Sequence, residues 1–114
     1  MSNALPIDRE RHGNAEILRP KGEIDLDVSP NFRRVLLDCL HQGRDVVVDM
    51  AGVTYIDSSG IASLAEALHT SRRRGLHLAL ARLPESAMKV LRIARLDQVF
   101  PIQDEPDPSF GDTR

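Results

Sequence analysis

The side chains most able to do chemistry in this sequence lie in one short run, Asp57-Ser58-Ser59-Gly60. Asp and Ser are favoured at the N-cap of a helix, where a side-chain oxygen accepts hydrogen bonds from the free amides of the first turn. Asp57 or Ser58 is therefore expected to cap a helix that starts here. The run predicts a serine hydroxyl at a helix N-terminus, where it could act as a nucleophile or simply complete the cap.

Two patterns on either side of this run indicate the elements that hold it. Val46–Val48 is β-branched and apolar without interruption, which is typical of a strand covered on both faces. After Gly60 the apolar residues have the i, i+3, i+4, i+7 spacing of a helix. The strand is expected to run straight into the helix, and the hydroxyl to lie at the mouth of a sheet. The spaced apolar residues are Ile61, Leu64, Ala65 and Leu68.

The remaining elements follow in order along the chain. Ile7–His12 and Ala15–Gly22 form a first hairpin, with the earlier segment as an edge strand. Ser29 and Pro30, as N-cap and N1, start a helix with an apolar stripe. A strand at 76–80, a helix introduced by Pro84 and a short strand at 99–102 complete the pattern. The stripe consists of Phe32, Val35, Leu36, Cys39 and Leu40.

Strands separated by helices of this length require crossover connections, which favour a mostly parallel sheet. We expect a single small α/β domain with an antiparallel hairpin on its N-terminal side, spanning residues 7–102. Residues 1–6 are expected to be a disordered N-terminus, and 103–114 a flexible, acidic, proline-containing tail. Sites in such sheets lie outside the carboxyl ends of the strands. Asp57-Ser58-Ser59-Gly60 lies there, and Gly22–Asp27 joins it if the second and third strands are parallel.

Composition restricts the partner. The chain has 114 residues and a formal net charge of −2, which gives no strong field for nucleic acid, so a protein partner is the default. Arg72–Arg74 followed by Gly75 suits a helix C-terminus and needs no nucleic-acid ligand. The single cysteine, Cys39, is expected to be a buried thiol in a reducing compartment. No apolar run has the length of a membrane span, so we expect a cytoplasmic protein without direct membrane insertion.

Enzymatic alternatives find little support in the sequence. A nucleophile elbow needs glycine before its serine and a histidine base, whereas Asp57 precedes Ser58. Nothing directs a histidine towards Ser58, and no glycine-rich phosphate loop occurs. We therefore expect no enzyme, no metal and no cofactor. The histidines are His12, His41, His69 and His77, and the carboxylates without a recognisable metal-ligand spacing are Asp25, Asp27, Asp49 and Asp57.

Three elements, in this order, resemble the STAS domain family, whose founding members are bacterial anti-sigma factor antagonists. The first is Gly22-Glu23-Ile24-Asp25, and the second is the strand and turn from Val46 to Gly60. The third is the closing segment from Leu91 to Ile102. The resemblance covers about residues 14 to 102 and implies a four- or five-stranded sheet with three or more helices.

The resemblance also implies a function. In the family the serine after the aspartate accepts a phosphate, which corresponds here to Ser58. It implies an anti-sigma factor antagonist that binds an anti-sigma factor with serine kinase activity and is switched off by that phosphate. The alternative is a regulatory subunit that binds the ATPase of an ABC-type lipid transporter. The partner-binding residues implied are Asp25, Asp57, Ser58, Ser59 and Gly60.

The two adjacent serines are not equivalent. If Asp57 or Ser58 is the N-cap, Ser59 already lies in or at the first helical turn, where its side chain follows the helix surface. Ser58 is then expected to be the more protruding hydroxyl.

Overall fold

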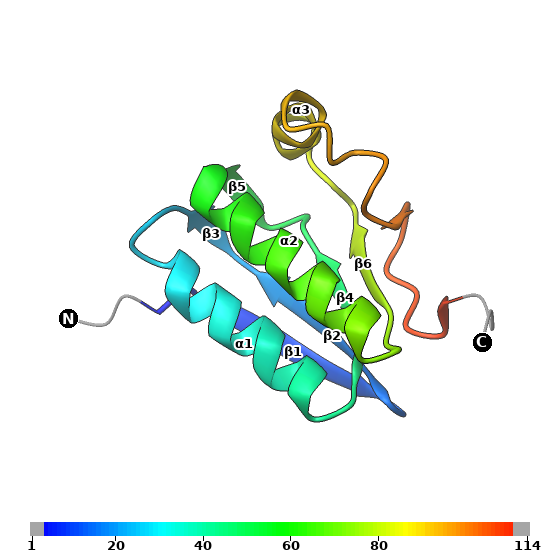
Figure 1. The fold of residues 1–114 in the computed structure, drawn as a ribbon. Coiled ribbons are helices and arrows are strands. Elements are labelled where there is room, and N and C mark those ends of the chain that lie inside the picture. Colours follow the sequence, from blue (N-terminus) through cyan, green and yellow to red (C-terminus); the bar gives the residue numbers. More distant parts are fainter. Residues whose placement is uncertain (1–3, 111–114) are drawn as a thin grey trace.

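The structure is a computed structural model that describes residues 4–110, and within that range the chain alternates strands and helices (Figure 1). The helices are α1 (Ser29–His41), α2 (Ser58–Arg73) and α3 (Glu85–Ile93). The strands are β1 (Ile7–His12), β2 (Ala15–Pro20), β3 (Gly22–Ile24), β4 (Asp45–Asp49), β5 (Val53–Ile56), β6 (Leu78–Ala81) and β7 (Ile102–Gln103).

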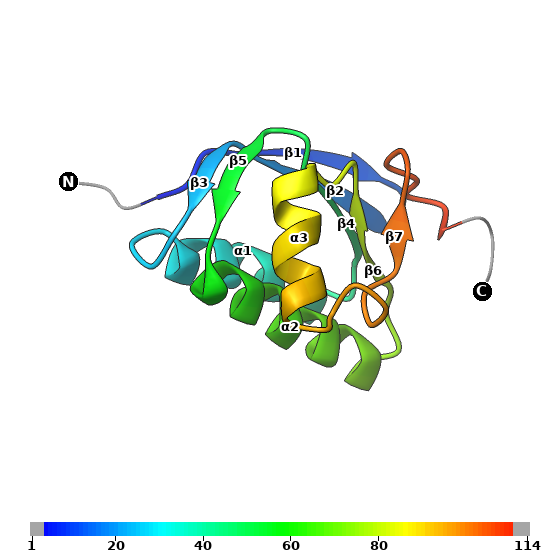
Figure 2. The same ribbon diagram turned by 90° about the horizontal axis from the view of Figure 1, so that it is seen from above.

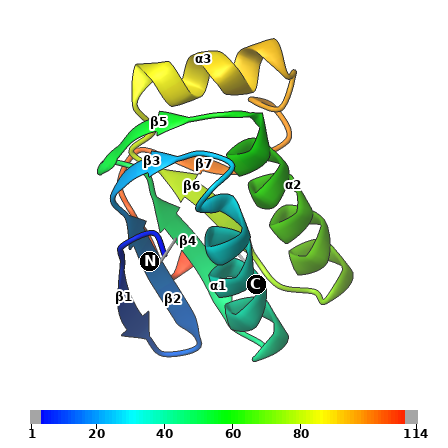
Figure 3. The same cartoon turned by 90° about the vertical axis from the view of Figure 1, so that its left-hand side faces the viewer.

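Five of these strands form one sheet in the order β1-β2-β4-β6-β7. β1 pairs antiparallel with β2 and lies at an edge, whereas β2, β4, β6 and β7 run parallel. The predicted α/β fold with an N-terminal hairpin is confirmed. α1 and α2 lie side by side on one face of the sheet (Figures 1 and 3). The last strand is shorter and later than expected, at Ile102–Gln103.

The strand at β4 does not run straight into α2, so that prediction was wrong. The chain turns after Asp49 and forms β5, which pairs in parallel with β3 as a separate two-stranded sheet. This small sheet lies at the opposite end of the molecule from β7 (Figure 2). β5 lacks the period-two pattern of a half-buried strand, because its two ends are buried and its two central residues are exposed.

The helices pack through the stripes that their spacing predicts. In α1 the fully buried side chains are Phe32, Leu36, Cys39 and Leu40. The predicted N-cap at Ser29 was wrong by one residue, since α1 has Val28 as its N-cap without a side-chain cap. The Asp25 carbonyl accepts hydrogen bonds from the amides of Val28 and Ser29, so Ser29 already lies in the helix.

Cys39 is buried, as predicted. Burial, with the nearby Glu16 carboxylate, raises the pKa of its thiol to about 11. Glu16 is itself only 2% exposed and forms ion pairs with Arg9 and Arg44. The thiol is therefore a packing group beside a paired carboxylate.

Two arginines at the end of α2 serve the fold. Arg74 Nε donates to the Leu40 carbonyl at 3.0 Å and its Nη2 to the His41 carbonyl at 3.1 Å, so it satisfies the C-terminus of α1. Arg72 donates to the Val99 carbonyl at 3.0 Å. Gly75, with φ of 68°, follows as the left-handed residue. These contacts support the structural interpretation of the basic run.

The other face of the sheet has its own small apolar cluster, Ile17, Val47 and Ala81, with Phe110 packed against it. The Phe110 ring also stacks on His77, with 5.1 Å between ring centroids. Gln103 exchanges two hydrogen bonds with the backbone of Asp107 in the segment that leads to Phe110. The expectation that 103–114 is flexible stays a prediction, and 111–114 lie outside the described residues.

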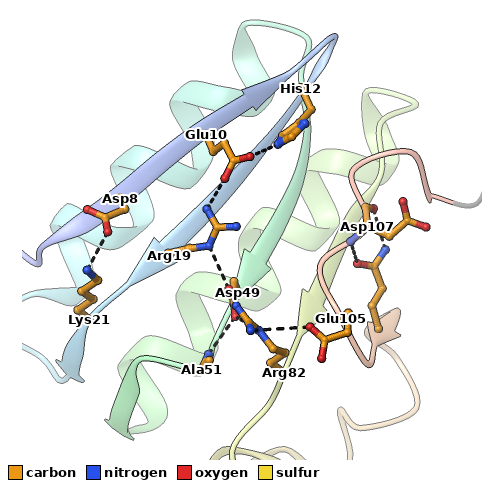
Figure 4. A network of polar contacts seen from close by, with 11 residues as sticks. Asp8, Glu10, His12, Arg19, Lys21, Asp49, Ala51, Arg82, Glu105 and Asp107 are labelled. Atoms are coloured by element: carbon orange, nitrogen blue, oxygen red, sulfur yellow. Dashed lines mark hydrogen bonds and ion pairs between the residues drawn. The ribbon is translucent and has the colours of Figure 1, made fainter.

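Polar contacts join the strands on this same face (Figure 4). The Asp49 carboxylate, 2% exposed, accepts hydrogen bonds from Arg19 Nε at 3.2 Å and Arg82 Nε at 3.1 Å, and forms an ion pair with each arginine. It also accepts the Ala51 amide at 3.2 Å, which fixes the turn towards β5. Burial alone would raise the pKa of Asp49, but the hydrogen bonds from Arg82 and Ala51 outweigh it and hold the pKa below its ordinary value.

Replacing Asp49 tests this network. Asp49→Asn should lower the free energy of unfolding at pH 7 by about 2 to 3 kcal/mol, because hydrogen bonds to a buried charged group are lost. The folded pKa of Asp49 lies below the unfolded one, so its contribution is present above about pH 4 and is lost as the pH falls through the folded pKa. Urea unfolding of both proteins at pH 7 and at pH 3 should show a smaller difference at the lower pH.

Glu10→Gln is the matched control, since Glu10 belongs to the same network through Arg19 but its side chain is 46% exposed. Glu10→Gln should lower the free energy of unfolding by less than about 1 kcal/mol. An equal loss of unfolding free energy in the two variants would show that burial of Asp49 does not strengthen its contribution.

Candidate partner-binding and phosphorylation site

The carboxyl ends of β3 and β5 bring two distant segments together. Because these strands are parallel, Asp25 and Asp57 emerge at the same edge of the small sheet. The Asp57 amide donates to the Ile24 carbonyl at 3.1 Å, and the Leu26 backbone is near enough to Asp57 to help lower the pKa of its carboxylate. The loop after β3 is thus tied to the start of α2, as expected for parallel strands (Figure 3).

Asp57 is the N-cap of α2, which settles the choice between Asp57 and Ser58. Its Oδ1 accepts the Ser59 amide at 2.9 Å, the Gly60 amide at 3.2 Å and the Ser59 hydroxyl at 2.6 Å. The hydrogen bond from the Ser59 side chain, followed by those from backbone amides, lowers the pKa of Asp57 below its ordinary value despite partial burial. The carboxylate is therefore ionised at neutral pH, next to Ser58.

The two serines differ as their order predicts. Ser58 is exposed, and its hydroxyl makes no hydrogen bond with any residue of the described chain. Ser59 is half-buried, and its hydroxyl is committed to Asp57. Of the two, only the Ser58 hydroxyl is available to an incoming molecule.

Gly60 allows α2 to start directly on the small sheet. A Cβ at this position would lie 2.6 Å from Ile56 Cγ1 and 2.8 Å from Ile24 Cγ2, closer than carbon atoms approach. One turn later the Ser63 hydroxyl lies 3.1 Å from the Ser59 carbonyl and 3.4 Å from the Ser29 carbonyl, so it links the first turns of α2 and α1. Gly60 and Ser63 thus fix the position of the start of α2, and with it the position of Ser58.

Asp25 shapes the neighbouring loop. Its side chain is half-buried and its Oδ1 accepts the Asp27 amide at 3.1 Å, while its carbonyl accepts the first amides of α1. Between them Leu26 is 73% exposed, and on β5 Tyr55 is 51% exposed. Sequence reasoning missed both residues, because an apolar residue in a strand-like stretch is normally read as core.

The four histidines lie away from this edge. His12 pairs with Glu10 on β1, and His77 stacks on Phe110 at the other face of the sheet. His41 ends α1, and His69 follows Ser58 by eleven residues of α2, about 16 Å along the helix. Within residues 4–110 there is no group of three His, Cys, Asp or Glu side chains that could hold a metal ion. No helix in that range is both long and apolar enough to cross a bilayer.

Comparison with known families agrees with this geometry. The model of the STAS domain matches residues 6–107, which is most of the chain. The chain belongs to the STAS domain family. The anti-sigma-B factor antagonist of Bacillus subtilis is 26% identical to this STAS domain over 98 residues, which cover 86% of this chain and 90% of the relative.

Solved structures share the fold. The Thermotoga maritima protein tm1081 superposes with a TM-score of 0.86 at 22% identity, covering 95% of this chain and 94% of that one. The Bacillus cell fate determinant SpoIIAA superposes in its phosphorylated form with a TM-score of 0.70 at 16% identity, covering 88% of this chain and 93% of that one. The unphosphorylated form of SpoIIAA superposes with a TM-score of 0.75.

A substitution at Gly60 tests how the start of α2 is packed. Gly60→Ala should lower the free energy of unfolding by about 1 to 3 kcal/mol, because Ile24 and Ile56 must move to admit the methyl group. Urea denaturation measures the change. Ser58→Ala, two residues earlier and exposed, should stay within about 0.5 kcal/mol of the original protein. If Gly60→Ala left the free energy of unfolding unchanged or raised it, the start of α2 would have more space beside Ile24 and Ile56 than these distances indicate.

Proposed function

We propose that this STAS domain is an anti-sigma factor antagonist: a non-enzymatic regulatory module that binds an anti-sigma factor with serine kinase activity. Phosphorylation of Ser58 by that kinase would switch binding off. The proposed contact surface is Asp25, Asp57, Ser58 and Ser59, and the buried Gly60, named with them from the sequence, supports this surface from beneath. The names of its relatives supply the partner class, and the exposed Ser58 hydroxyl at the start of α2 is the observation that carries the switch.

The hydrogen bonds around Asp57 explain why a phosphate on Ser58 would stay at the surface. The amides of Ser59 and Gly60, which could otherwise cradle an anion at a helix N-terminus, already bind the Asp57 carboxylate. A phosphate adds about −1.5 to −2 charges and three acceptor oxygens. Beside the ionised Asp57 it would meet repulsion rather than a prepared pocket.

The consequence for binding is electrostatic. The phosphate would change the potential of a small surface while the fold stays as it is, and like charges or unpaired polar groups brought into a tight interface cost several kcal/mol. SpoIIAA, solved with and without its phosphate, resembles this chain in both forms, which supports a switch without refolding.

The binding experiment uses purified candidate anti-sigma factors of the serine kinase class from the source organism. The original protein and Ser58→Ala should bind one of these factors, whereas Ser58→Asp should bind at least about 100-fold more weakly by isothermal titration calorimetry with ADP present. Circular dichroism should show the same fold for all three. Equal binding by Ser58→Asp would remove the switch, and co-purification with a transporter ATPase in place of the kinase would assign the alternative function.

Phosphate mapping tests the choice of serine. Incubation with the kinase and ATP, followed by fragmentation mass spectrometry, should place one phosphate on Ser58, because only this hydroxyl is free to align with the donor phosphoryl group. Ser59→Ala should still be phosphorylated and Ser58→Ala should not. Phosphate on Ser59 would contradict the proposal.

A further inference from the structure

Leu26 is the feature of this edge that the proposed function leaves unexplained. It follows β3 directly and is 73% exposed, although it is a large apolar residue in the middle of an acidic segment. Single exposed leucines are common on protein surfaces, so exposure alone assigns nothing. What distinguishes Leu26 is how its backbone is held and what surrounds it.

The backbone on both sides of Leu26 is fixed. Two residues earlier, the Ile24 carbonyl accepts the amide of Asp57, the N-cap of α2, at 3.1 Å. The preceding residue, Asp25, accepts the Asp27 amide through Oδ1 and the amides of Val28 and Ser29 through its carbonyl. A side chain presented from a fixed loop loses little conformational entropy when a partner covers it, which favours a role as an anchor.

The ionisable side chains of the segment that carries Leu26 are all acidic. Glu23, Asp25 and Asp27 belong to residues 22–28, and Asp57 is tied to the same segment through its amide, which donates to the Ile24 carbonyl. None of these four carboxylates forms an ion pair with a residue of the described chain, whereas Asp8, Glu10, Glu16, Asp49 and Glu66 all do. Complementary charge at an interface here would be positive.

We propose that Leu26 is an apolar anchor that inserts into a pocket of the anti-sigma factor, and that lysine or arginine side chains on the rim of that pocket face the surrounding carboxylates. This inference rests on the proposed function and adds to it the residue that supplies apolar contact beside Ser58. On the adjoining β5 the exposed Tyr55 pairs with Glu23 of the same acidic segment.

The experiment measures the affinity of the full chain for the anti-sigma factor by isothermal titration calorimetry. Leu26→Ala should bind about 10- to 50-fold more weakly, because the methyl and methylene groups that fill the pocket are removed. Leu26→Met keeps the apolar volume and should bind within about threefold of the original protein. Thermal unfolding should be unchanged in both, since the side chain is exposed.

Ile102→Ala is the matched control. Ile102 is 39% exposed on β7, at the other end of the molecule from the small sheet (Figure 2), so its truncation should leave affinity unchanged. Affinity of the original protein should also fall between about 0.05 M and about 0.5 M NaCl, because salt screens the charged rim.

The outcomes separate the two proposals. If the original protein binds, Ser58→Asp does not and Leu26→Ala binds as well as the original, the anchor is wrong and the proposed function stands. Affinity independent of salt would overturn the basic rim. If the original protein does not bind the anti-sigma factor at all, the proposed function fails and the anchor fails with it.

Discussion

Asp57 holds the candidate site together. Its carboxylate caps α2 through the amides of Ser59 and Gly60 and fixes the Ser59 hydroxyl, while its own amide binds the Ile24 carbonyl at the end of β3. Segments about thirty residues apart in the chain thereby share one anchor point. The position of Ser58 at the helix start and part of the local negative charge depend on Asp57.

Because Asp57 uses the first amides of α2, the site differs from a phosphate-binding helix terminus. Such a terminus holds an anion and stabilises it. Here the protein supplies the anion itself, so a second negative group on Ser58 would face outward. This arrangement fits a site at which a phosphate would be exposed to a partner better than a site that changes conformation to bind the phosphate.

Much of the fold could be predicted because burial and periodicity coincide in β4, α1 and α2, where Val46–Val48 and the helix stripes are fully buried. β5 was missed because its exposed Thr54 and Tyr55 are adjacent and break the alternation. Glu16 and Asp49 were not recognised as buried, since their arginine partners come from distant parts of the chain and only folding brings them together. The candidate site residues could be expected at one edge of the sheet, but the exposure of Leu26 could not, because it depends on a turn formed by Asp25.

The apolar cluster on the second face of the sheet determines how far the chain must extend. Ile17, Val47 and Ala81 form an apolar strip that α1 and α2 do not reach, and Phe110 is the side chain that packs on it. A protein shortened before that residue would carry the strip uncovered, and an uncovered apolar strip is a place where molecules adhere to one another. For anyone joining a reporter or a second domain to this one, the junction belongs after Phe110, even though the sheet itself ends at Gln103.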